Sequence, residues 1–354
     1  MRLIYWSIGL MFSSCCIAQN SKLVPVNDIE TLKRSYTGEI KWEQPSKTVT
    51  FLTSGKIYFR NRNNFKNIYW GVPEDVRRIV IEKDVTVNGH FHVRNNLTIE
   101  GRHRETSKVF GTSVQHLLRN NNLDKDGGTP PYSAFYASGD LEMNITNLTS
   151  INPVGFHFTG KNGAKIHLSE VNALDNRGGS HNHSDGISAA AGSTVKNCYF
   201  STGDDVIKVY ADILVENTEI RMIQNSVPIQ FGWGNYGSNA KGTFKNLTIT
   251  GSKGRKSTGN AIIDARKGFY YKEILIDGFV VNNSNATLFD FWNEGVNGKR
   301  GGGMVKVNIK NASITVGQFR KYWNMDTHII ICDKIFTAKN TDTHISCRED
   351  LKSK

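Results

Sequence analysis

The sequence contains almost no long hydrophobic run, which excludes a protein built from membrane-spanning helices. Its only marked apolar segment, Leu3–Phe12, is too short to cross a bilayer, and no second apolar stretch exists. One early arginine precedes this segment and small residues follow it up to Ala18, a pattern typical of a secretory leader cleaved before Gln19. We therefore expect a signal peptide over residues 1–18, no membrane span, and a secreted protein, either extracellular or periplasmic.

Cysteine is also scarce, with five residues in the whole chain. Removal of the expected leader leaves Cys198, Cys332 and Cys347. Because exported proteins fold in an oxidising compartment, we expect a disulfide between Cys332 and Cys347, and we expect Cys198 to be a buried, small apolar residue. Lipid modification of Cys15 or Cys16 is the alternative to a simple cleaved leader.

Linkers rich in proline or serine are missing, so no composition shift divides the chain. A length of 354 residues exceeds the usual single core, but elongated repeat folds pass that limit because each unit packs only on its neighbours. We expect one domain over residues 19–354, acting as a monomer. Residues Asn27–Tyr36 have the apolar spacing of a short capping helix, and residues from about 317 to 354 are expected to form a C-terminal cap.

Acidic residues are outnumbered, 32 against 44 lysines and arginines, which gives a formal net charge of +12. Such a protein attracts polyanions at long range. For an exported protein an acidic or sulfated polysaccharide is a more natural partner than nucleic acid, and a merely solvated basic surface is the alternative. We therefore expect a polysaccharide partner and no nucleic acid.

What the sequence does contain is a recurring heptapeptide. The copies, in chain order, are ITNLTSI, LSEVNAL, VKNCYFS, VENTEIR, FKNLTIT, LIDGFVV and IKNASIT, with RNNLTIE at Asn96 preceding them. Their third residues, which we call the marker residues, lie 20 to 34 positions apart and are Asn147, Glu170, Asn197, Asn217, Asn246, Asp277 and Asn311.

Each copy alternates apolar and polar residues and is rich in β-branched residues, while no amphipathic helix competes in this region. Short strands repeating at this interval favour an all-β fold, a single-stranded right-handed parallel β-helix in which the apolar residues stack into one continuous core. A β-sandwich is the alternative, but its turns recur at shorter intervals and give no reason for one polar residue to recur in the same place.

Two short acidic segments, SDGI and DDVI, occupy consecutive repeats, and we call the acid and the two residues after it in each an acidic triplet. Asp185 in SDGI and Asp205 in DDVI each precede their marker residue by twelve positions, and Asp204 stands beside Asp205. Neighbouring strands are about 4.8 Å apart, so the three carboxyl groups should lie close together. Like charges at that distance raise each other's proton affinity, and paired carboxyl groups facing one substrate are what glycosidic bond hydrolysis requires. A turn-forming role for each Asp-Gly or Gly-Asp step is the alternative.

The following repeats supply comparable groups, and their segments VPIQFGWGNYG, NAIIDARKG and ATLFDFWNEG contain aromatic and cationic residues. Aromatic faces stack on sugar rings and cations hold anionic substituents, so these segments predict a polysaccharide cleft along the helix axis. The candidate substrate-binding residues here are Gln230, Trp233, Asp264, Arg266 and Trp292, with Asp290 as a further carboxylate.

His181 and His183 precede the first acidic triplet and could ligate a metal together with Asp185. No further histidine or cysteine is near in sequence, so zinc is not expected, and His183 is expected to hydrogen bond around the acids and the substrate. Calcium held by the three aspartates is the rival interpretation, because carboxylate oxygens are the ligands that calcium prefers. Apart from calcium, no cofactor is expected.

The stretch SDGI followed by GDDVIKVY resembles the paired aspartate motifs of the polygalacturonase and dextranase families, which belong to the pectin-lyase-like superfamily of right-handed parallel β-helices. The segment IQFGW and the lysine directly after DDVI look closer to dextranases, whereas the Gly-His-Gly and Arg-Ile-Lys patterns of polygalacturonases are absent. The match covers residues 184–233. It implies an inverting hydrolase in which Asp204 protonates the leaving sugar, Asp185 and Asp205 activate water, and Lys208 and Trp233 place the substrate.

The implied function is a secreted, endo-acting glycoside hydrolase. Its expected substrate is anionic, a sulfated galactan such as carrageenan or a uronan, with a dextran-like glucan as the alternative. Inversion predicts about 6.5 to 9.5 Å between the acid and the base. Two other functions stay open: a calcium-dependent polysaccharide lyase in which Lys208 or Arg266 abstracts a proton, and a non-catalytic glycan-binding β-helix.

Overall fold

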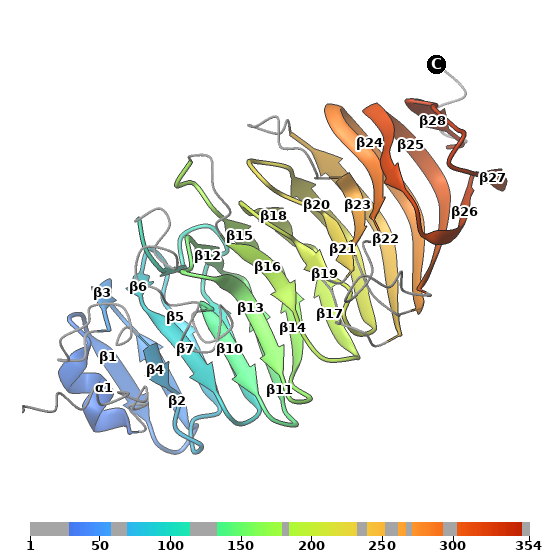
Figure 1. The fold of residues 1–354 in the computed structure, drawn as a ribbon. Helices are drawn as coiled ribbons and strands as arrows, with labels where there is room; N and C mark the ends of the chain where they lie inside the picture. Colours follow the sequence, from blue (N-terminus) through green and yellow to red (C-terminus); the bar gives the residue numbers. More distant parts are fainter. Residues whose placement is uncertain are drawn as a thin grey trace, which may run out of the picture.

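The computed structural model describes residues 28–57, 69–113, 133–178, 184–231, 239–251, 261–266, 271–292 and 303–348. Within these stretches, 28 strands and one short helix follow one another in coils that stack along a single axis (Figure 1). The chain therefore folds as a parallel β-helix, as the repeat predicted. The expected signal peptide, with Cys15 and Cys16, lies outside the described residues.

Parallel pairing joins each strand to the equivalent strand of the next coil and creates three walls, which we call sheets A, B and C. Sheet A carries the acidic triplets. Its strands are β4 (Tyr69–Gly71), β7 (His90–Val93), β10 (Phe135–Ser138), β13 (Phe156–Lys161), β16 (Asp185–Ser188), β19 (Ile207–Lys208), β21 (Ile229–Phe231), β23 (Ala261–Arg266) and the last parts of β24 (Tyr271–Trp292) and β25 (Met304–Trp323).

Sheet B precedes sheet C in each coil. The strands of sheet B are β1 (Ile40–Glu43), β2 (Thr48–Phe51), β5 (Arg78–Ile81), β8 (Leu97–Gly101), β11 (Glu142–Thr146), β14 (Lys165–Ser169), β17 (Ser193–Lys196), β26 (Asp326–Ile331), β27 (Lys334–Phe336) and the first parts of β20 (Ile213–Arg221), β22 (Ala240–Thr250), β24 and β25.

Sheet C forms the third wall. It consists of β3 (Gly55–Lys56), β6 (Thr86–Asn88), β9 (Lys108–Phe110), β12 (Thr149–Ile151), β15 (Asn172–Leu174), β18 (Tyr199–Ser201), β28 (His344–Ser346) and the later parts of β20, β22, β24 and β25. In the later coils one long strand thus turns the corner from sheet B into sheet C without a break.

Columns of identical or similar side chains fill the space between the walls. Phe91, Phe135 and Phe158 lie in register on sheet A, with ring centroids 5.6 and 5.5 Å apart and planes 10° and 11° from parallel. The next coils continue this column with Ile187, Ile207, Ile229 and Ile263. Each such buried side chain contributes about 1.5 to 3 kcal/mol through removal from water. Strand alternation then places the residue after each isoleucine on the outer side of sheet A.

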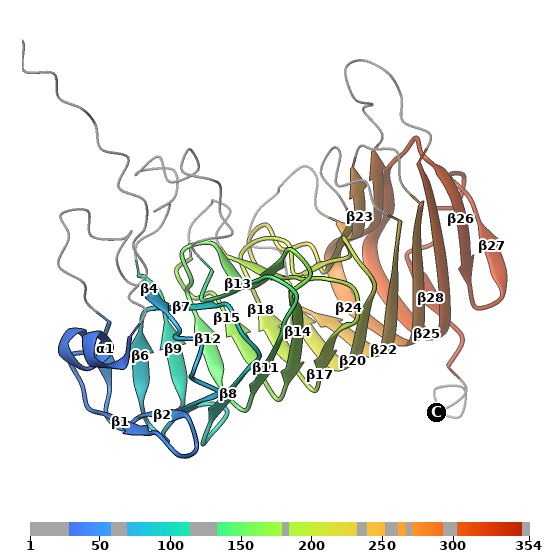
Figure 2. The ribbon, with the colours of Figure 1, turned by 90° about the horizontal axis from the view of Figure 1, so that it is seen from below.

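Helix α1 (Ile29–Ser35) closes the first coil, and Figure 2 shows it at one end of the stack with β26 and β27 at the other. The Asp28 side chain caps the helix, since its carboxylate accepts a hydrogen bond of 2.6 Å from the Thr31 N–H. Ile29 and Leu32 are buried in the core, which confirms the predicted capping helix. No helix among the described residues has the length and apolar character needed to cross a membrane.

All marker residues except Asp277 lie at the corner between sheets B and C. Left-handed backbone angles, with φ between 48° and 55°, occur at Asn147, Glu170, Asn197, Asn217, Asn246 and Asn311. Asparagine tolerates this conformation better than most residues because its short amide bonds locally. Adjacent amides also bond along the stack: Asn217 donates to Asn197 over 3.2 Å and Asn246 donates to Asn217 over 2.9 Å.

The copies LIDGFVV and RNNLTIE were aligned wrongly in the sequence prediction. The register matches Asn246 and Asn311 with Gly278, which has φ 78°, and not with Asp277. Glycine adopts a positive φ without a steric cost, so it replaces asparagine at this corner. The copy around Asn96 lies at the start of β8 in sheet B, not at the corner, because the apolar alternation is the same in both sheets.

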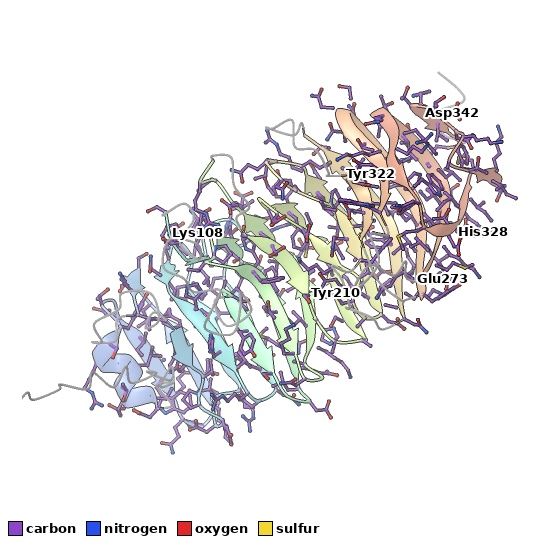
Figure 3. All side chains as sticks on the ribbon, viewed as in Figure 1. Lys108, Tyr210, Glu273, Tyr322, His328 and Asp342 are labelled. Carbon is purple, nitrogen blue, oxygen red and sulfur yellow. A yellow bond between two sulfur atoms is a disulfide. The ribbon has the colours of Figure 1, made fainter. Side chains whose placement is uncertain are left out.

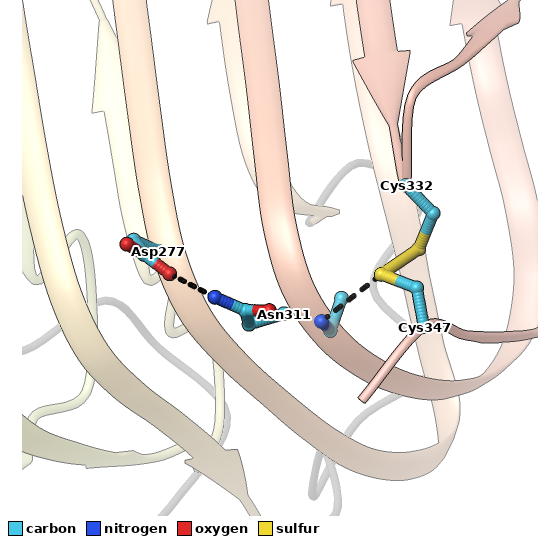
Figure 4. The surroundings of a disulfide bond; sticks show 5 residues. Asp277, Asn311, Cys332 and Cys347 are labelled. Atoms are coloured by element: carbon cyan, nitrogen blue, oxygen red, sulfur yellow. Dashed lines mark hydrogen bonds between the residues drawn. A yellow bond between two sulfur atoms is a disulfide. The ribbon is translucent and has the colours of Figure 1, made fainter. Parts of the chain in front are cut away.

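The C-terminal end changes from parallel to antiparallel pairing at β27 and β28. There, Cys332 and Cys347 form the predicted disulfide, fifteen residues apart in sequence (Figure 4). The Ala312 N–H of β25 donates to the Cys347 Sγ over 3.3 Å, which fixes the bridge against the last full coil. Cys198 is buried, as predicted for a small apolar residue.

Candidate functional site

Three carboxyl groups meet on sheet A. Ile187 of β16 pairs with Ile207 of β19, so Asp185 and Asp205 occupy the same position on adjacent coils, as the spacing predicted. One oxygen each from Asp185, Asp204 and Asp205 lies within 4.8 Å of the other two. A full turn of the chain therefore brings residues twenty positions apart into one acidic cluster.

The glycine of SDGI allows this close approach of the two coils. The Gly186 N–H donates to the Asp205 carbonyl over 2.8 Å. A Cβ atom at position 186 would lie only 2.2 Å from the Val206 carbonyl oxygen. Any larger residue would therefore push β16 away from the chain that carries Asp204 and Asp205.

Lys208 supplies the counter-charge of the cluster. Its Nζ lies 3.0 Å from Asp185 Oδ1 and 2.7 Å from Asp205 Oδ2, and its side chain is only 7% exposed. Burial disfavours the ammonium, but the charges of Asp185 and Asp205 outweigh burial and raise the pKa of Lys208 well above its usual value. The rings of Phe156 and Tyr210, at 5.1 and 5.8 Å, also contact the cation, and Tyr210 marks the middle of the stack in Figure 3.

Asp204 differs from the other two acids. It is partly exposed, and its Oδ1 accepts a hydrogen bond of 3.0 Å from the Asn225 amide. Burial of the carboxyl, followed by the negative charges of Asp205 and Asp185, raises the pKa of Asp204 well above 3.8. Lys208 opposes this effect only in part, because its ammonium is already engaged by the other pair. These surroundings favour the protonated form of the Asp204 carboxyl group.

Asp185 lies nearer to its ionised form. Burial and the charge of Asp205 raise the pKa of Asp185, Lys208 lowers it, and the result is about 6. The raised pKa thus favours the protonated form of Asp204, whereas Lys208 favours the carboxylate of Asp185, with which it makes an ion pair. A donor and an acceptor of protons within one cluster is the arrangement that acid and base catalysis requires.

The acids lie closer together than the sequence prediction for inversion allowed. An acid and base separated by about 6.5 to 9.5 Å were expected, whereas the nearest oxygens lie within 4.8 Å. The strand spacing sets this distance, and Lys208 draws Asp185 and Asp205 toward one point.

The predicted substrate-binding residues continue the row that begins at Lys208. Lys208 pairs with Gln230, Gln230 with Asp264, and Asp264 with Asp290, one residue per coil on the outer side of sheet A. The three residues after Lys208 are at most 1% exposed, and the Gln230 amide makes no hydrogen bond to the described residues. Contact with substrate stays a prediction for them, as does the cleft itself.

The structure describes two of the four remaining candidate residues. Arg266 pairs in register with Trp292 at the end of the same sheet. The Trp292 ring stacks on Tyr322, with centroids 5.3 Å apart and planes 25° from parallel, and Tyr322 is 44% exposed. His183 and Trp233 lie outside the described residues, so their predicted roles stay predictions.

Calcium fits the acidic cluster poorly. Between Asp185 and Asp205, where a cation would bind two carboxylates, the Lys208 ammonium already makes both ion pairs. A divalent ion there would have to displace the buried lysine, which would break both of its ion pairs, or lie beside it and be repelled by its charge. The donor set therefore matches a lysine-neutralised site better than a metal site.

Sequence reasoning missed the residues that form hydrogen bonds with the cluster or with its neighbour in the chain, Ser184. Asn225 binds Asp204 from the next coil, and Ser184, His157 and Asp175 form a buried hydrogen-bond network next to Asp185. Ser184 was visible as the first letter of SDGI, but nothing in the sequence links it to Asp175 or His157, because β14 and β15 lie between His157 and Asp175 in the chain and the contacts follow no repeat.

The fold and the acid cluster together match what the sequence predicted for a β-helical glycoside hydrolase. The sequence profile of the family described as "Glycosyl hydrolases family 28" matches residues 56–262, which is more than half of the chain. The chain therefore belongs to glycosyl hydrolases family 28.

Two curated relatives are dextranases. The dextranase of Arthrobacter sp. (strain CB-8) is 23% identical over 227 residues, and that of Arthrobacter globiformis is 23% identical over 229 residues. Each match covers 61% of this chain and 34% of the relative, so the chain spans about a third of the length of these relatives. Among solved structures, Dex49A from Penicillium minioluteum matches 82% of this chain and 61% of its own, with a TM-score of 0.48 and 13% identity.

Proposed function

We propose that the protein hydrolyses internal glycosidic bonds of a polysaccharide with inversion, using Asp204 as general acid and Asp185 with Asp205 as general base. The observation that supports this proposal is the different surroundings of the carboxyl groups within one cluster. Asp204 has a raised pKa and makes no ion pair with Lys208 in this cluster, whereas Asp185 and Asp205 are both ion-paired with it. The two roles thus follow from the environment of each carboxyl group.

In the proposed reaction, Asp204 gives its proton to the glycosidic oxygen while the bond from that oxygen to the anomeric carbon breaks. A water molecule loses a proton to Asp185 or Asp205 and forms the new bond to carbon from the opposite side. Both transfers rely on groups held in place before the substrate arrives, which lowers the barrier without reorganisation. Proton exchange with solvent then resets the acid and the base.

Retention with a covalent intermediate is the competing route, and the short distances within the cluster resemble its geometry. A nucleophilic Asp185 or Asp205 would have to leave the shared ammonium to attack carbon. A water molecule held by both carboxylates needs no such movement. Proton NMR of freshly cleaved product distinguishes the routes, since inversion gives the opposite anomer first.

For the substrate we favour an uncharged glucan of the kind that the dextranase relatives are named for. Asp264 and Asp290 continue the row beyond Lys208, so this row adds acidic and not basic residues beside the cluster. Glutamates also pair with exposed cations of sheet B, as in Arg78–Glu100 and Lys165–Glu142. These ion pairs reduce the positive charge that could attract an acidic polysaccharide. A sulfated galactan or uronan is the second candidate, supported by the net charge of +12.

A reducing-end assay on dextran, polygalacturonate and carrageenans tests the reaction and the substrate together. The Asp204→Asn variant should lower the rate by at least about a hundredfold, the usual effect of losing a general acid. Asp326→Asn, an exposed aspartate at the start of β26, is the matched control and should leave the rate unchanged. Full activity of Asp204→Asn would contradict the proposal.

A calcium-dependent lyase is disfavoured by the charge state of Lys208. A lyase base must accept a proton, but the carboxylates around Lys208 raise its pKa and keep it protonated. We therefore expect no ultraviolet-absorbing unsaturated product and no loss of activity with a chelator. Formation of such a product, or loss of activity with a chelator, would support the lyase.

We further propose that the protein is secreted and acts as a monomer. The Cys332–Cys347 disulfide supports an oxidising compartment. Helix α1 covers the first coil and antiparallel strands close the last one, which protects the edges where a second copy could add strands. Light scattering after gel filtration and detection in culture medium test the two statements.

A further inference from the structure

Ser184 connects the acid and the base of the cluster. It directly precedes Asp185 in the chain, and its carbonyl oxygen accepts a hydrogen bond of 3.1 Å from the Asp204 N–H. Any displacement of Ser184 would therefore move both groups that the proposed reaction needs. The side chain of Ser184 is fully buried, so its placement is set by the protein and not by solvent.

Asp175 holds Ser184 from the other side. Its Oδ2 accepts hydrogen bonds from the Ser184 hydroxyl, at 2.7 Å, and from the Ser184 N–H, at 3.2 Å. Asp175 itself is fixed at the end of β15, where its N–H donates to the Ser201 carbonyl over 2.7 Å. This clamp joins two residues nine positions apart in sequence. The clamp therefore fixes the residue that directly precedes Asp185.

His157 completes the network. Its Nε2 lies 3.2 Å from the Ser184 Oγ and its Nδ1 lies 2.8 Å from the Ser150 Oγ. Because the Ser184 hydroxyl donates to Asp175, its oxygen accepts from His157 Nε2–H, and Nδ1 accepts from Ser150. Burial lowers the pKa of His157 to about 3, so the ring is neutral and keeps this pattern at ordinary pH.

The network adds no net charge next to the catalytic acids. Arg177 donates to Asp175 through its Nε over 3.1 Å and through a terminal nitrogen, and both side chains are at most 3% exposed. The buried carboxylate is thereby balanced by a buried guanidinium, with a neutral His157 beside them. Such a unit can fix geometry while the charges that act on Asp185 come from Lys208 and Asp205.

We infer that Asp175 and His157 are positioning residues for the reaction, and that they act by fixing Ser184 and through it the relative placement of Asp204 and Asp185. The inference rests on the proposed function, because it assigns the network a role in the same acid and base chemistry. Small misplacements of reacting groups are costly, so the network affects catalysis and not only folding.

The Ser184→Ala variant tests the inference, since it removes one hydroxyl and changes no charge. We expect kcat to fall roughly tenfold to a hundredfold with little change in KM, and the acid limb of the pH profile to shift as Asp185 moves relative to Lys208. Ser193→Ala is the matched control. Ser193 is also a buried serine whose hydroxyl donates to a backbone carbonyl and accepts from a backbone N–H, but it lies on sheet B.

A second pair of variants separates hydrogen bonding from shape. His157→Gln keeps a donor toward Ser184 and should retain most of kcat, whereas His157→Leu removes it and should behave like Ser184→Ala. The inference is overturned if Ser184→Ala and His157→Leu lower the melting temperature, as Ser193→Ala does, while kcat per folded molecule and the pH profile stay those of the parent. Failure of the proposed function would appear separately, as full activity of Asp204→Asn.

Discussion

At the scale of single residues, Lys208 divides three similar carboxyl groups into two kinds. Asp185 and Asp205 share its ammonium, while Asp204 binds the Asn225 amide and keeps a raised pKa. Three carboxyl groups this close could not all ionise without such a partner. In the proposed reaction, the lysine therefore determines which carboxyl group donates a proton and which accepts one.

Replacing Lys208 with methionine should shift the pH dependence of the reaction. In the parent, kcat/KM should rise as Asp185 loses its proton, around pH 6. Lys208 lowers the pKa of Asp185, so without the ammonium this rise should occur at higher pH. A pH–rate profile of parent and variant measures the shift, and an unmoved acid limb would contradict the account.

The same substitution should change how stability depends on pH. The folded-state pKa of Asp185, about 6, lies above its ordinary value of 3.8, so its contribution to stability is largest below that ordinary value and is lost as pH rises through about 6. In Lys208→Met the loss should continue to higher pH. Melting temperatures at pH 5 and pH 8 should therefore differ more in the variant than in the parent.

At the scale of structural elements, the corner between sheets B and C decides how one coil stacks on the next. Asn217 has φ 48°, donates to Asn197 and accepts from Asn246. Its side chain is exposed, so it contributes through its backbone conformation and through its amide hydrogen bonds to Asn197 and Asn246, which we call the amide ladder. A corner of this kind fixes the register of both sheets.

An Asn217→Ala substitution should lower the free energy of unfolding by about 1 to 2 kcal/mol, because alanine is strained in the left-handed region and makes no amide bond. Asn217→Gly should cost less, since glycine accepts the backbone angle and loses only the ladder. Denaturant unfolding of the three proteins measures the difference. An equal loss for alanine and glycine would show that backbone strain is not the cause.

The sequence was sufficient to predict the elements that repeat. The spacing from Asp185 to Asn197 and from Asp205 to Asn217 placed the acids on adjacent coils, and the register confirms this. It was insufficient at Gly278, where glycine replaces asparagine and shifts the alignment by one residue. The Ser184 network could not be predicted either, because its partners lie on other coils and follow no repeat.

At the scale of the whole molecule, the stack is closed differently at its two ends. Helix α1 caps the first coil, and a hairpin with a disulfide closes the last one (Figures 2 and 4). Because each coil contacts mainly its neighbours, the two ends should unfold without direct effect on the coils that carry Asp185 and Asp205.

Removal of the disulfide should therefore affect stability and not catalysis. A loop of fifteen residues closed by a bridge is worth about 3 kcal/mol by loop-closure entropy. The double variant Cys332→Ser, Cys347→Ser should melt at a lower temperature, while kcat at 25 °C stays that of the parent. A large fall in kcat at a temperature where the variant is folded would show that the C-terminal end is coupled to the acids.

The most direct test of the central claim compares two substrates in two variants. On a dinitrophenyl oligosaccharide, whose leaving group needs no proton, Asp204→Asn should retain near-parental activity while it loses activity on the polysaccharide. Asp185→Asn should lose activity on both, because the base is needed in either case. If Asp204→Asn loses both activities equally, Asp204 is not the proton donor and the assignment of the cluster is wrong.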